Sequence, residues 1–485
     1  MPDLDIQCPT QAYIGGRWCD ASDGRTFDVT NPATGEVIAT VADCGADETR
    51  TAIAAADAAQ KAWAGWTASD RANVLKRWRD LMVAQADRLA RVLMLENGKP
   101  LAEARGEILY GASYLEWFAE ESRRIYGDVI PAPAADKRIV VIRQPVGVCA
   151  AITPWNFPNA MLARKAAAAL AAGCTMVAKP AEDTPLSALV MAELAGEAGI
   201  PKGVFNVVPT SRPADVGGEL TSSPTVRKIS FTGSTEIGRL LLRQAAGTIK
   251  KVSMELGGNA PFIVFDDADL DAAADGLMAS KFRNAGQTCV CANRIFVHSK
   301  IMDAFAEKVL ERVAKLKVAG GDVEGAEIGP LINEDAVTKV ERLVSAAQGA
   351  GARLVTGGQR NEAGKLFYQP TIMSRVVPSM EIAREEIFGP VAAMITFDNE
   401  EDVVAMANDT PYGLAAYAYT RDLGRAWRVS EALEYGMVGI NEGVISSAAA
   451  PFGGVKQSGM GREGSRYGID DYLELKYIMM GGLGA

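Results

Sequence analysis

Cys289 and Glu255 are the two side chains whose types and settings could perform chemistry together. Cys289 lies in the segment 284–291, which reads NAGQTCVC, and Glu255 lies in the apolar, glycine-flanked stretch MELGG. A thiol that loses its proton is a strong nucleophile. A carboxyl group in an apolar setting has a raised pKa and can act as a general base near neutral pH. The pair could therefore run a two-step covalent mechanism, in which the thiol captures a carbonyl carbon and the acid activates the water that releases the product.

Other catalytic systems fit the sequence less well. The chain contains one histidine, His298, so a histidine-centred triad is nearly excluded. His298 lies past Cys289 in a strand-like run, where we expect a structural role. Because His and Cys residues do not cluster at ligand spacing, we expect no metal site.

A rigid aromatic segment, Pro154–Pro158, follows a predicted strand and precedes a predicted helix. Its Asn156 could present an amide N–H where an oxyanion develops during carbonyl chemistry. The alternative is an aromatic-lined turn in which Asn156 caps the helix. Taken alone, the segment favours the helix cap.

Three further segments could hold a dinucleotide. Residues 231–238, FTGSTEIG, place small residues before a helix, where backbone amides and the helix dipole favour a pyrophosphate; the alternative is a simple helix cap. Lys179 and Glu182 follow a buried strand and could hold a ribose, and Glu182 would repel a 2′-phosphate, favouring NAD over NADP; the alternative is a solvated ion pair. Residues 385–390, EEIFGP, could hold the second ribose and support a nicotinamide ring, or could end a helix in a turn.

Two arginines near the proposed chemistry could bind an anion. Arg164 lies on the helix after Asn156, and Arg283 lies six residues before Cys289. A guanidinium group suits bidentate binding of a carboxylate. A surface position is the commoner role of a single arginine, but two near the chemistry favour a carboxylate site.

The composition indicates a soluble enzyme. The 485 residues are 48% hydrophobic and 23% charged, which predicts two or three domains, and the net charge of −10 argues against nucleic acid or an anionic membrane as partner. Seven scattered cysteines do not form a disulfide framework. The acidic start Met1–Asp5 lacks a secretory signal, and the longest apolar run, Ala166–Ala178, is too short for a bilayer. We therefore expect a cytoplasmic protein.

Two blocks of alternating strands and helices predict α/β domains with parallel sheets. In the first block, strands are expected at Val146–Ile152, Thr175–Ala178, Gly203–Val208, Val226–Phe231 and Ile249–Met254, with helices at Ala160–Ala172 and at Thr184–Ala198, the latter capped by Thr184 with Pro185 at its first position. The second block has expected strands at Ala292–Val297, Val391–Phe397 and Ala415–Thr420, and a helix at Ile301–Leu316. Two segments fit neither block, Ile125–Ile142 and Tyr472–Met480; the second is expected to dock on another subunit.

Taken together, the motifs resemble the aldehyde dehydrogenase superfamily over nearly the whole chain and in that family's order. The motifs are Pro154–Pro158, Lys179–Pro185, Phe231–Gly238, Glu255–Gly258, Gly286–Cys289, Glu386–Pro390 and Pro451–Gly454. The nearest likeness is to the succinate-semialdehyde branch, through Cys289–Arg294, Lys179–Pro185 and Lys456–Gly459 running on to Tyr472–Tyr477. The resemblance implies a Rossmann-type NAD-binding domain at 1–122 and 146–257, an α/β catalytic domain at 258–457, and a small β oligomerisation domain from 123–145 and 458–485.

The resemblance also implies roles for individual residues. Cys289 would be the nucleophile, Glu255 the base, and Asn156 with the Cys289 N–H the oxyanion hole, while Lys165 and Glu463 match proton-relay positions. Arg164, Arg283 and Ser446 match residues that bind the far carboxylate of a semialdehyde. The cofactor would be NAD, with NADP less favoured, and it would contact Thr153, Trp155, Lys179, Glu182, Gly233, Ser234, Glu386 and Phe388.

The implied function is NAD(P)-dependent oxidation of succinate semialdehyde to succinate, through a thiohemiacetal and a thioester of Cys289. The alternative substrate is glutarate semialdehyde or another ω-carboxylated aldehyde, because the small residues Ser447–Ala450 at the substrate entrance depart from the family pattern. A homodimer or homotetramer is implied. A thiol hydrolase or acyltransferase would use the same pair of residues but would not need Glu182 and Glu386, and a non-catalytic protein is disfavoured because the catalytic positions are intact.

Cys291 is a candidate redox partner of Cys289. Two residues apart on an extended segment, both side chains would point to one face, with Cα atoms roughly 6.6 Å apart, near the upper limit for a disulfide. A strained, easily reduced bridge could then switch the enzyme off reversibly. The equal alternative is that Cys291 is a small buried packing residue.

Overall fold

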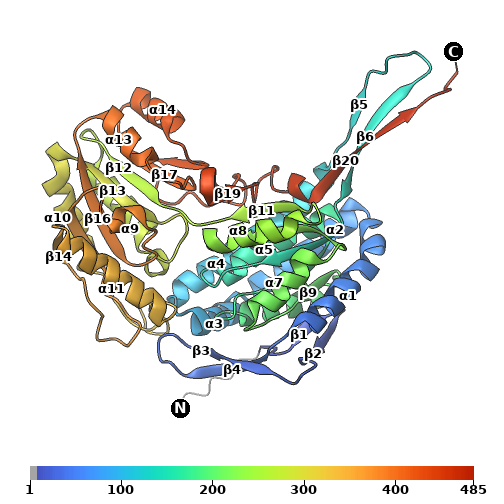
Figure 1. The fold of residues 1–485 in the computed structure, drawn as a ribbon, viewed down its shortest axis with the longest axis horizontal. Helices are drawn as coiled ribbons and strands as arrows, with labels where there is room; N and C mark the ends of the chain where they lie inside the picture. The colour runs from blue at the N-terminus through green and yellow to red at the C-terminus, as the bar shows by residue number, and fades with distance from the viewer. Residues whose placement is uncertain (1–7, 485) are drawn as a thin grey trace.

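The computed structural model describes residues 8–484 and folds them into two α/β bodies with a projecting arm (Figure 1). The bodies are built on an eight-stranded and a seven-stranded sheet, and the arm on a three-stranded sheet. The acidic start Met1–Asp5, on which the expectation about a secretory signal rests, lies outside the described residues. Within residues 8–484, no helix is both long enough and apolar enough to cross a bilayer.

The eight-stranded sheet confirms the expected parallel arrangement. Its five central strands run parallel in the order β11, β10, β7, β8 and β9, and antiparallel neighbours close its edges, β1 beside β9 and β19 beside β11. Its strands are β1 (Ala12–Ile14), β2 (Arg17–Cys19), β7 (Val148–Ile152), β8 (Thr175–Lys179), β9 (Phe205–Val207), β10 (Val226–Thr232), β11 (Lys251–Glu255) and β19 (Gly459–Met460). β7 and β8 are buried along their whole length, as expected of strands covered by helices on both faces.

Eight helices accompany this sheet: α1 (Ala46–Ala64), α2 (Ala68–Ala84), α3 (Ala86–Asn97), α4 (Leu101–Glu121), α5 (Pro158–Ala172), α6 (Leu186–Glu197), α7 (Pro213–Ser222) and α8 (Thr235–Ala246). Every residue of α5 is buried, which its run of alanines allows because small side chains permit close helix packing. α5 packs along α4 and places two of the expected site residues, Arg164 and Lys165, in the interior.

The start of α6 corrects one sequence prediction. Thr184 is not its cap: the helix begins at Leu186, Pro185 occupies the cap position, and the Thr184 hydroxyl donates to the Trp155 carbonyl at 3.5 Å. The buried carboxylate of Glu96 instead accepts hydrogen bonds from the backbone N–H groups of Leu186 (2.7 Å) and the next residue. A carboxylate from a neighbouring helix thus satisfies amides that a local cap would bond.

Other element ends shift by a few residues from the sequence predictions. β7 begins at Val148, and α5 begins two residues before Ala160. β11 begins after Ile249, whose φ of 52° is incompatible with a strand. β16 (Val391–Phe397) has the expected bounds.

The seven-stranded sheet, in the order β14-β15-β16-β13-β12-β17-β18, is parallel except for the β14–β15 pair. Its strands are β12 (Ala260–Val264), β13 (Ala292–His298), β14 (Arg353–Thr356), β15 (Thr371–Val376), β16 (Val391–Phe397), β17 (Ala415–Tyr419) and β18 (Met437–Ile440). Its helices are α9 (Leu270–Lys281), α10 (Met302–Val313), α11 (Glu334–Gly349), α12 (Glu381–Arg384), α13 (Glu400–Asn408) and α14 (Leu423–Ala432). The second predicted α/β block is therefore present.

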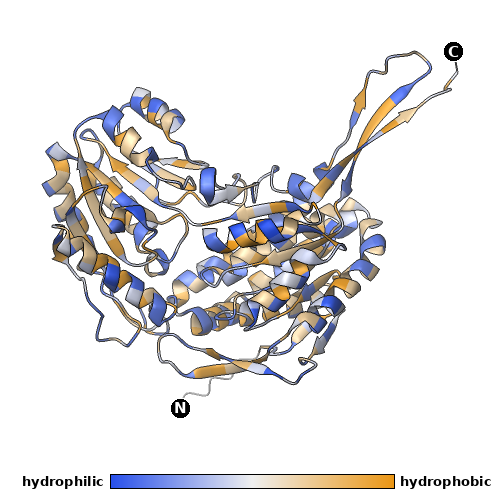
Figure 2. Cartoon of the chain, in the orientation of Figure 1, coloured by the Kyte–Doolittle hydropathy of each residue, from blue (hydrophilic) through white to orange (hydrophobic). Residues whose placement is uncertain are grey.

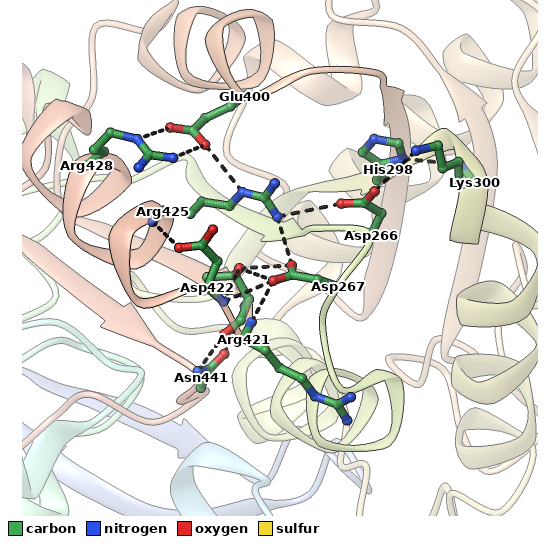
Figure 3. A network of polar contacts seen from close by, with 11 residues as sticks. Asp266, Asp267, His298, Lys300, Glu400, Arg421, Asp422, Arg425, Arg428 and Asn441 are labelled. Atoms are coloured by element: carbon green, nitrogen blue, oxygen red, sulfur yellow. Dashed lines mark hydrogen bonds and ion pairs between the residues drawn. The ribbon is translucent and has the colours of Figure 1, made fainter.

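His298 ends β13 as a packed side chain. Its Nδ1 accepts a hydrogen bond from the Lys300 backbone N–H at 3.2 Å, and its ring packs edge-on against Phe397 with centroids 5.3 Å apart. Figure 3 shows the imidazole beside a polar network in which Arg425 bridges Asp267 and Glu400. These contacts support the expected structural role of His298.

The arm joins the two segments that fitted neither predicted block. β5 (Asp128–Ile130), β6 (Arg138–Pro145) and β20 (Leu473–Met480) pair antiparallel in the order β20-β6-β5. Its strands carry exposed apolar side chains, including Val129 (78% exposed) and Leu475 (68% exposed), and Figure 2 shows the apolar colouring along the arm. A separate two-stranded sheet, β3 (Thr26–Thr30) with β4 (Val37–Ala42), lies near the N-terminal end.

The three-domain division stays a prediction, and the pairing of β19 bears on its last segment. β19 belongs to the segment 458–485 that was assigned to oligomerisation, but it pairs with β11 of the eight-stranded sheet. The C-terminal segment therefore contributes to the first body before it enters the arm.

Candidate active site

A cavity of about 290 Å³ lies where β10 and β11 end. Ligands of parallel α/β sheets bind at the carboxyl ends of the strands. Most of the expected site residues line this cavity: Trp155, Asn156, Arg164, Gly233, Ser234, Glu255, Arg283, Cys289, Glu386, Phe388 and Ser446. Residues of both bodies, together with Ser446 and Phe452 from the segment between β18 and β19, thus line one cavity.

The turn before Cys289 has an unusual backbone. Asn284, Ala285 and Gly286 have φ angles of 51°, 53° and 77°, in the left-handed region. That region is unfavourable for residues with a Cβ, so surrounding contacts have to hold the turn. The Asn284 N–H donates to the Glu103 carboxylate at 2.8 Å, and a Cβ on Gly286 would collide with the Gly389 carbonyl.

The Cys289 thiol lines the cavity in surroundings that favour its protonated form. Burial raises the pKa of Cys289 to about 12, while Arg164 and Arg283 act in the opposite direction. Its carbonyl leaves no room for a side chain at position 258, because a Cβ on Gly258 would lie 2.6 Å from it. The backbone at Cys289 therefore packs closely against Gly258.

Asn156 lies beside this turn. The Asn156 side-chain amide donates to the Gln287 backbone carbonyl at 3.1 Å. The Asn156 backbone carbonyl accepts from the Asn284 side-chain amide at 3.0 Å. The Asn156 loop and the Cys289 turn are therefore bonded to each other, and both line the cavity.

Glu255 is a buried carboxyl group without a partner. It is 2% exposed, and neither of its carboxyl oxygens has a hydrogen-bond partner among the described residues. Burial, followed by the nearby negative charge of Glu463, raises the pKa of Glu255 well above its ordinary value. Such a group has the properties of a general base near neutral pH.

Lys165 and Glu463 meet in the interior, and Arg164 joins them. Both cations form ion pairs with the Glu463 carboxylate, and Lys165 also donates to the Ser230 hydroxyl at 3.1 Å. Although burial acts to raise it, Arg164 and Lys165 hold the pKa of Glu463 below its ordinary value. Glu463 is therefore an anion, in contrast to Glu255.

Two guanidinium groups face the cavity. The Arg164 guanidinium has an ion pair with Glu463 but no hydrogen-bond partner within residues 8–484, and it lies 4.4 Å from the Phe452 ring centroid. Arg283 lies over the Phe157 ring at 5.2 Å and has no carboxylate within 4.0 Å in the described part of the chain. Ser446 lines the same cavity. The site can thus accept a carboxylate group.

The end of β10 and the start of α8 form one wall of the cavity. Gly233 donates its N–H to the Glu255 carbonyl at 3.0 Å, and Ser234 caps α8 by accepting from the Ile237 N–H. The Thr232 hydroxyl is buried without a partner among the described residues. A helix start with a free hydroxyl beside it fits the phosphates of a dinucleotide.

Glu386 and Phe388 form a second wall. The Glu386 carboxylate accepts from the Gly258 N–H at 3.0 Å, and burial raises the pKa of Glu386 to about 7. Phe388 packs edge-on against Trp155, with centroids 5.6 Å apart. These groups suit a ribose and a flat ring.

Thr153, Lys179 and Glu182 lie outside the lining of this cavity, at the ends of β7 and β8. The Thr153 N–H donates to the Lys179 carbonyl at 3.1 Å, and the Lys179 ammonium pairs with the Glu182 carboxylate at 3.0 Å. The Lys179 side chain is 6% exposed and that of Glu182 is 45% exposed, so the carboxylate reaches solvent. This is the position at which a dinucleotide crossing the sheet would meet Glu182.

The expected geometry of Cys291 is wrong. Cys289 and Val290 lie in a turn closed by the Cys291 N–H and the Thr288 carbonyl at 3.0 Å, not on an extended segment. The buried Cys291 thiol contacts the Lys281 ammonium at 3.3 Å, whereas Cys289 lines the cavity, and both thiols are free. The argument that both thiols point to one face of an extended segment therefore no longer applies. Reversible oxidation of Cys289 and Cys291 stays a prediction.

Some cavity residues were not found from the sequence. They include Tyr110 and Met161 on α4 and α5, Lys339 on α11, and Phe452. Phe452 stood in a motif but without a role, and the helical residues carry no local signal because only tertiary packing turns them toward the cavity. Among residues 8–484, no group of three or more potential metal-ligating side chains comes together.

Comparisons with known proteins agree with this geometry. A model of the aldehyde dehydrogenase family matches residues 18–478. The chain is 61% identical over 471 residues to a succinate-semialdehyde dehydrogenase [NADP(+)] of Escherichia coli, covering 97% of this chain and 98% of that protein. It is 60% identical to a glutarate-semialdehyde dehydrogenase of Pseudomonas aeruginosa, covering 98% of each. A crystal structure of succinate-semialdehyde dehydrogenase from Burkholderia pseudomallei superposes with a TM-score of 0.97 at 59% identity, covering 99% of each chain.

Proposed function

Because this chain belongs to the aldehyde dehydrogenase family, we propose that it oxidises succinate semialdehyde to succinate with NAD as the preferred acceptor. The observation that carries the substrate class is the pair of cavity-facing guanidinium groups of Arg164 and Arg283. Arg164 is a buried cation whose guanidinium lacks hydrogen-bond partners in the described part of the chain, which is unfavourable unless a ligand supplies acceptors. A carboxylate at the far end of an aldehyde substrate does so.

In the proposed mechanism, the Cys289 thiol releases its proton to solvent and the thiolate attacks the aldehyde carbon. The Asn156 amide leaves Gln287 to stabilise the oxyanion of the resulting thiohemiacetal. A dinucleotide held by Ser234, Glu386 and Phe388 would supply the hydride acceptor for the oxidation of the thiohemiacetal to a thioester on Cys289. Glu255 then activates the water that hydrolyses the thioester, and its raised pKa suits this proton transfer.

Glu463 completes the proton path in this proposal. The Glu463 anion pairs with Lys165, which donates to Ser230, and this buried chain lies near enough to Glu255 for the charge of Glu463 to raise the pKa of Glu255. Lys165 has a lowered pKa because of its burial, which eases the loss of its proton.

The preference for NAD rests on Glu182. Its half-exposed carboxylate at the end of β8 would repel a 2′-phosphate and accept from a ribose hydroxyl. The Escherichia coli relative carries NADP(+) in its name, so relatives at this identity can differ in cofactor choice.

A steady-state comparison tests the substrate. Succinate semialdehyde, glutarate semialdehyde and an uncharged aldehyde of similar length are compared with each cofactor, in the parent enzyme and in Arg164→Ala and Arg283→Ala. Loss of a charged partner for a buried anion costs about 2–5 kcal/mol, so kcat/KM for succinate semialdehyde should fall at least about tenfold in each variant. The uncharged aldehyde should be much less affected.

Equal losses on charged and uncharged aldehydes would make the arginines structural. A higher kcat/KM for glutarate semialdehyde would favour the second candidate, which the Pseudomonas aeruginosa relative supports. Cys289→Ala serves as the control for the covalent mechanism: it should bind NAD and form no NADH, whereas a thiol hydrolase would produce no NADH in the parent enzyme either.

A further inference from the structure

One buried ion pair outside the cavity touches the loop that carries Asn156. Lys99, in the link between α3 and α4, and Glu107, on α4, have side chains that are each 1% exposed, and their charged groups lie 2.6 Å apart. Neither residue lines the cavity. Two charges are taken fully out of water here, which is unfavourable unless further hydrogen bonds compensate for the lost hydration.

Besides Glu107, Lys99 contacts the loop that carries Asn156. Its ammonium donates to the Asn156 carbonyl at 2.7 Å and lies 4.0 Å from the centroid of the Phe157 ring. The same carbonyl also accepts from Asn284 at 3.0 Å. The backbone of Asn156 is therefore held from one side by Lys99 and from the other by the turn that precedes Cys289.

Glu107 holds the helix that follows this loop. One of its oxygens accepts from the backbone N–H groups of Asn159 at 3.0 Å and Ala160 at 3.2 Å, in the first turn of α5. The α5 N-cap residue, Phe157, offers no capping side chain, so Glu107 supplies the anion that this helix start favours. One ion pair thus fixes both ends of the segment 156–160.

We propose that Lys99 and Glu107 are positioning residues for the oxyanion hole, which fix the backbone of Asn156 so that its side-chain amide meets the oxyanion formed on Cys289. This inference rests on the proposed function and adds residues that never touch the substrate. Rate depends steeply on such placement, since a displacement of about 1 Å can reduce a rate on the order of 100-fold.

Glu96 offers a matched control within the same chain. Glu96, on α3, is also a buried glutamate that accepts from two amides at a helix start, those of Leu186 at 2.7 Å and Ser187 at 2.9 Å. The helix that it bonds is α6, and Glu96 does not line the cavity. Glu96→Gln and Glu107→Gln therefore both alter a carboxyl group that bonds a helix start, but only Glu107 also pairs with Lys99, the residue that holds the Asn156 backbone.

The test measures NADH formation in a single turnover with saturating succinate semialdehyde and NAD. Lys99→Met and Glu107→Gln should slow this step at least about tenfold, because the oxyanion donor is displaced, while KM for the aldehyde and NAD binding change little. Glu96→Gln should keep the parent rate. If Lys99→Met does not fold, the Lys99→Met/Glu107→Gln double variant, which leaves no unpaired buried charge, replaces it.

An Asn156→Ala background decides whether the pair acts through Asn156. In that background Lys99→Met, or the double variant, should cause no further slowing, because residues that act through one group are not additive. The inference is overturned if Lys99→Met keeps the parent rate, if its loss multiplies with that of Asn156→Ala, or if Glu96→Gln is slowed as much. If Asn156→Ala itself is not slow, the oxyanion role in the proposed function fails first.

Discussion

At the residue scale, the site contains two buried carboxyl groups with opposite surroundings. Glu255 has no hydrogen-bond partner in the described chain and a raised pKa, whereas Glu463 lies between two cations and has a lowered one. Paired acids whose environments separate their pKa values take different roles in catalysis. Glu255 and Glu386, whose pKa values burial raises, are therefore the carboxyl groups of this cavity whose protonation changes as the pH rises.

A substitution of Glu255 tests this assignment. Release of the acid product requires the deprotonated carboxylate, so its rate should rise with pH through the raised pKa of Glu255. Glu255→Gln should lose that rising limb and slow thioester hydrolysis more than hydride transfer, so that a burst of NADH precedes slow turnover in stopped-flow measurements. Glu385→Gln, which alters a neighbouring acid paired with Arg342 at the surface, is the control. Loss of hydride transfer without any burst would mean that Glu255 acts first on the Cys289 thiol.

At the element scale, the sequence predicted strands and helices better than their junctions. The strand Val391–Phe397 has the predicted bounds because a short apolar run is a local signal. The cap of α6 and the conformation of residues 289–291 were predicted wrongly, because Glu96 and the Cys289 turn depend on contacts from distant segments. Most residues predicted for the chemistry line one cavity, and they were chosen because their types are informative. The ion pair of Lys99 was missed because nothing near it in the sequence indicates its burial.

The loop after β8 gives a prediction about cofactor choice. Glu182→Ser removes the carboxylate that would repel a 2′-phosphate, so it should raise kcat/KM with NADP and narrow the preference for NAD. Steady-state rates with both cofactors measure the ratio. Glu197→Ser, at the end of α6, is a control that should leave the ratio unchanged. A parent enzyme that prefers NADP would show that Glu182 does not face the ribose.

At the scale of the whole molecule, the arm is the part whose apolar side chains the rest of the chain leaves exposed. β5, β6 and β20 form a small sheet whose exposed apolar residues project away from both bodies (Figures 1 and 2). Apolar strands exposed in this way are typical of surfaces that pair with another subunit. The sequence predicted a docking role for this segment because its apolar tail had no place in either α/β block.

A charge placed on the arm tests its role in assembly. Leu475→Glu should shift the protein to a smaller species in light scattering, because a buried unpaired charge disfavours the interface. Leu423→Glu, at an 84% exposed leucine on α14, controls for the effect of an added charge elsewhere. An unchanged mass for Leu475→Glu, or an equal shift in both variants, would count against the arm as the interface.

The ion pairs of Glu463 also constrain the order in which the protein can be made. Synthesis proceeds from the N-terminus, and Glu463 follows Lys165 by 298 residues. Until that residue leaves the ribosome, α5 carries two cations that have no counterion in the interior, and the strand β19 that completes the eight-stranded sheet is also missing. The first body therefore cannot finish folding during translation, and a nascent chain stalled before residue 463 should remain a substrate for chaperones and proteases.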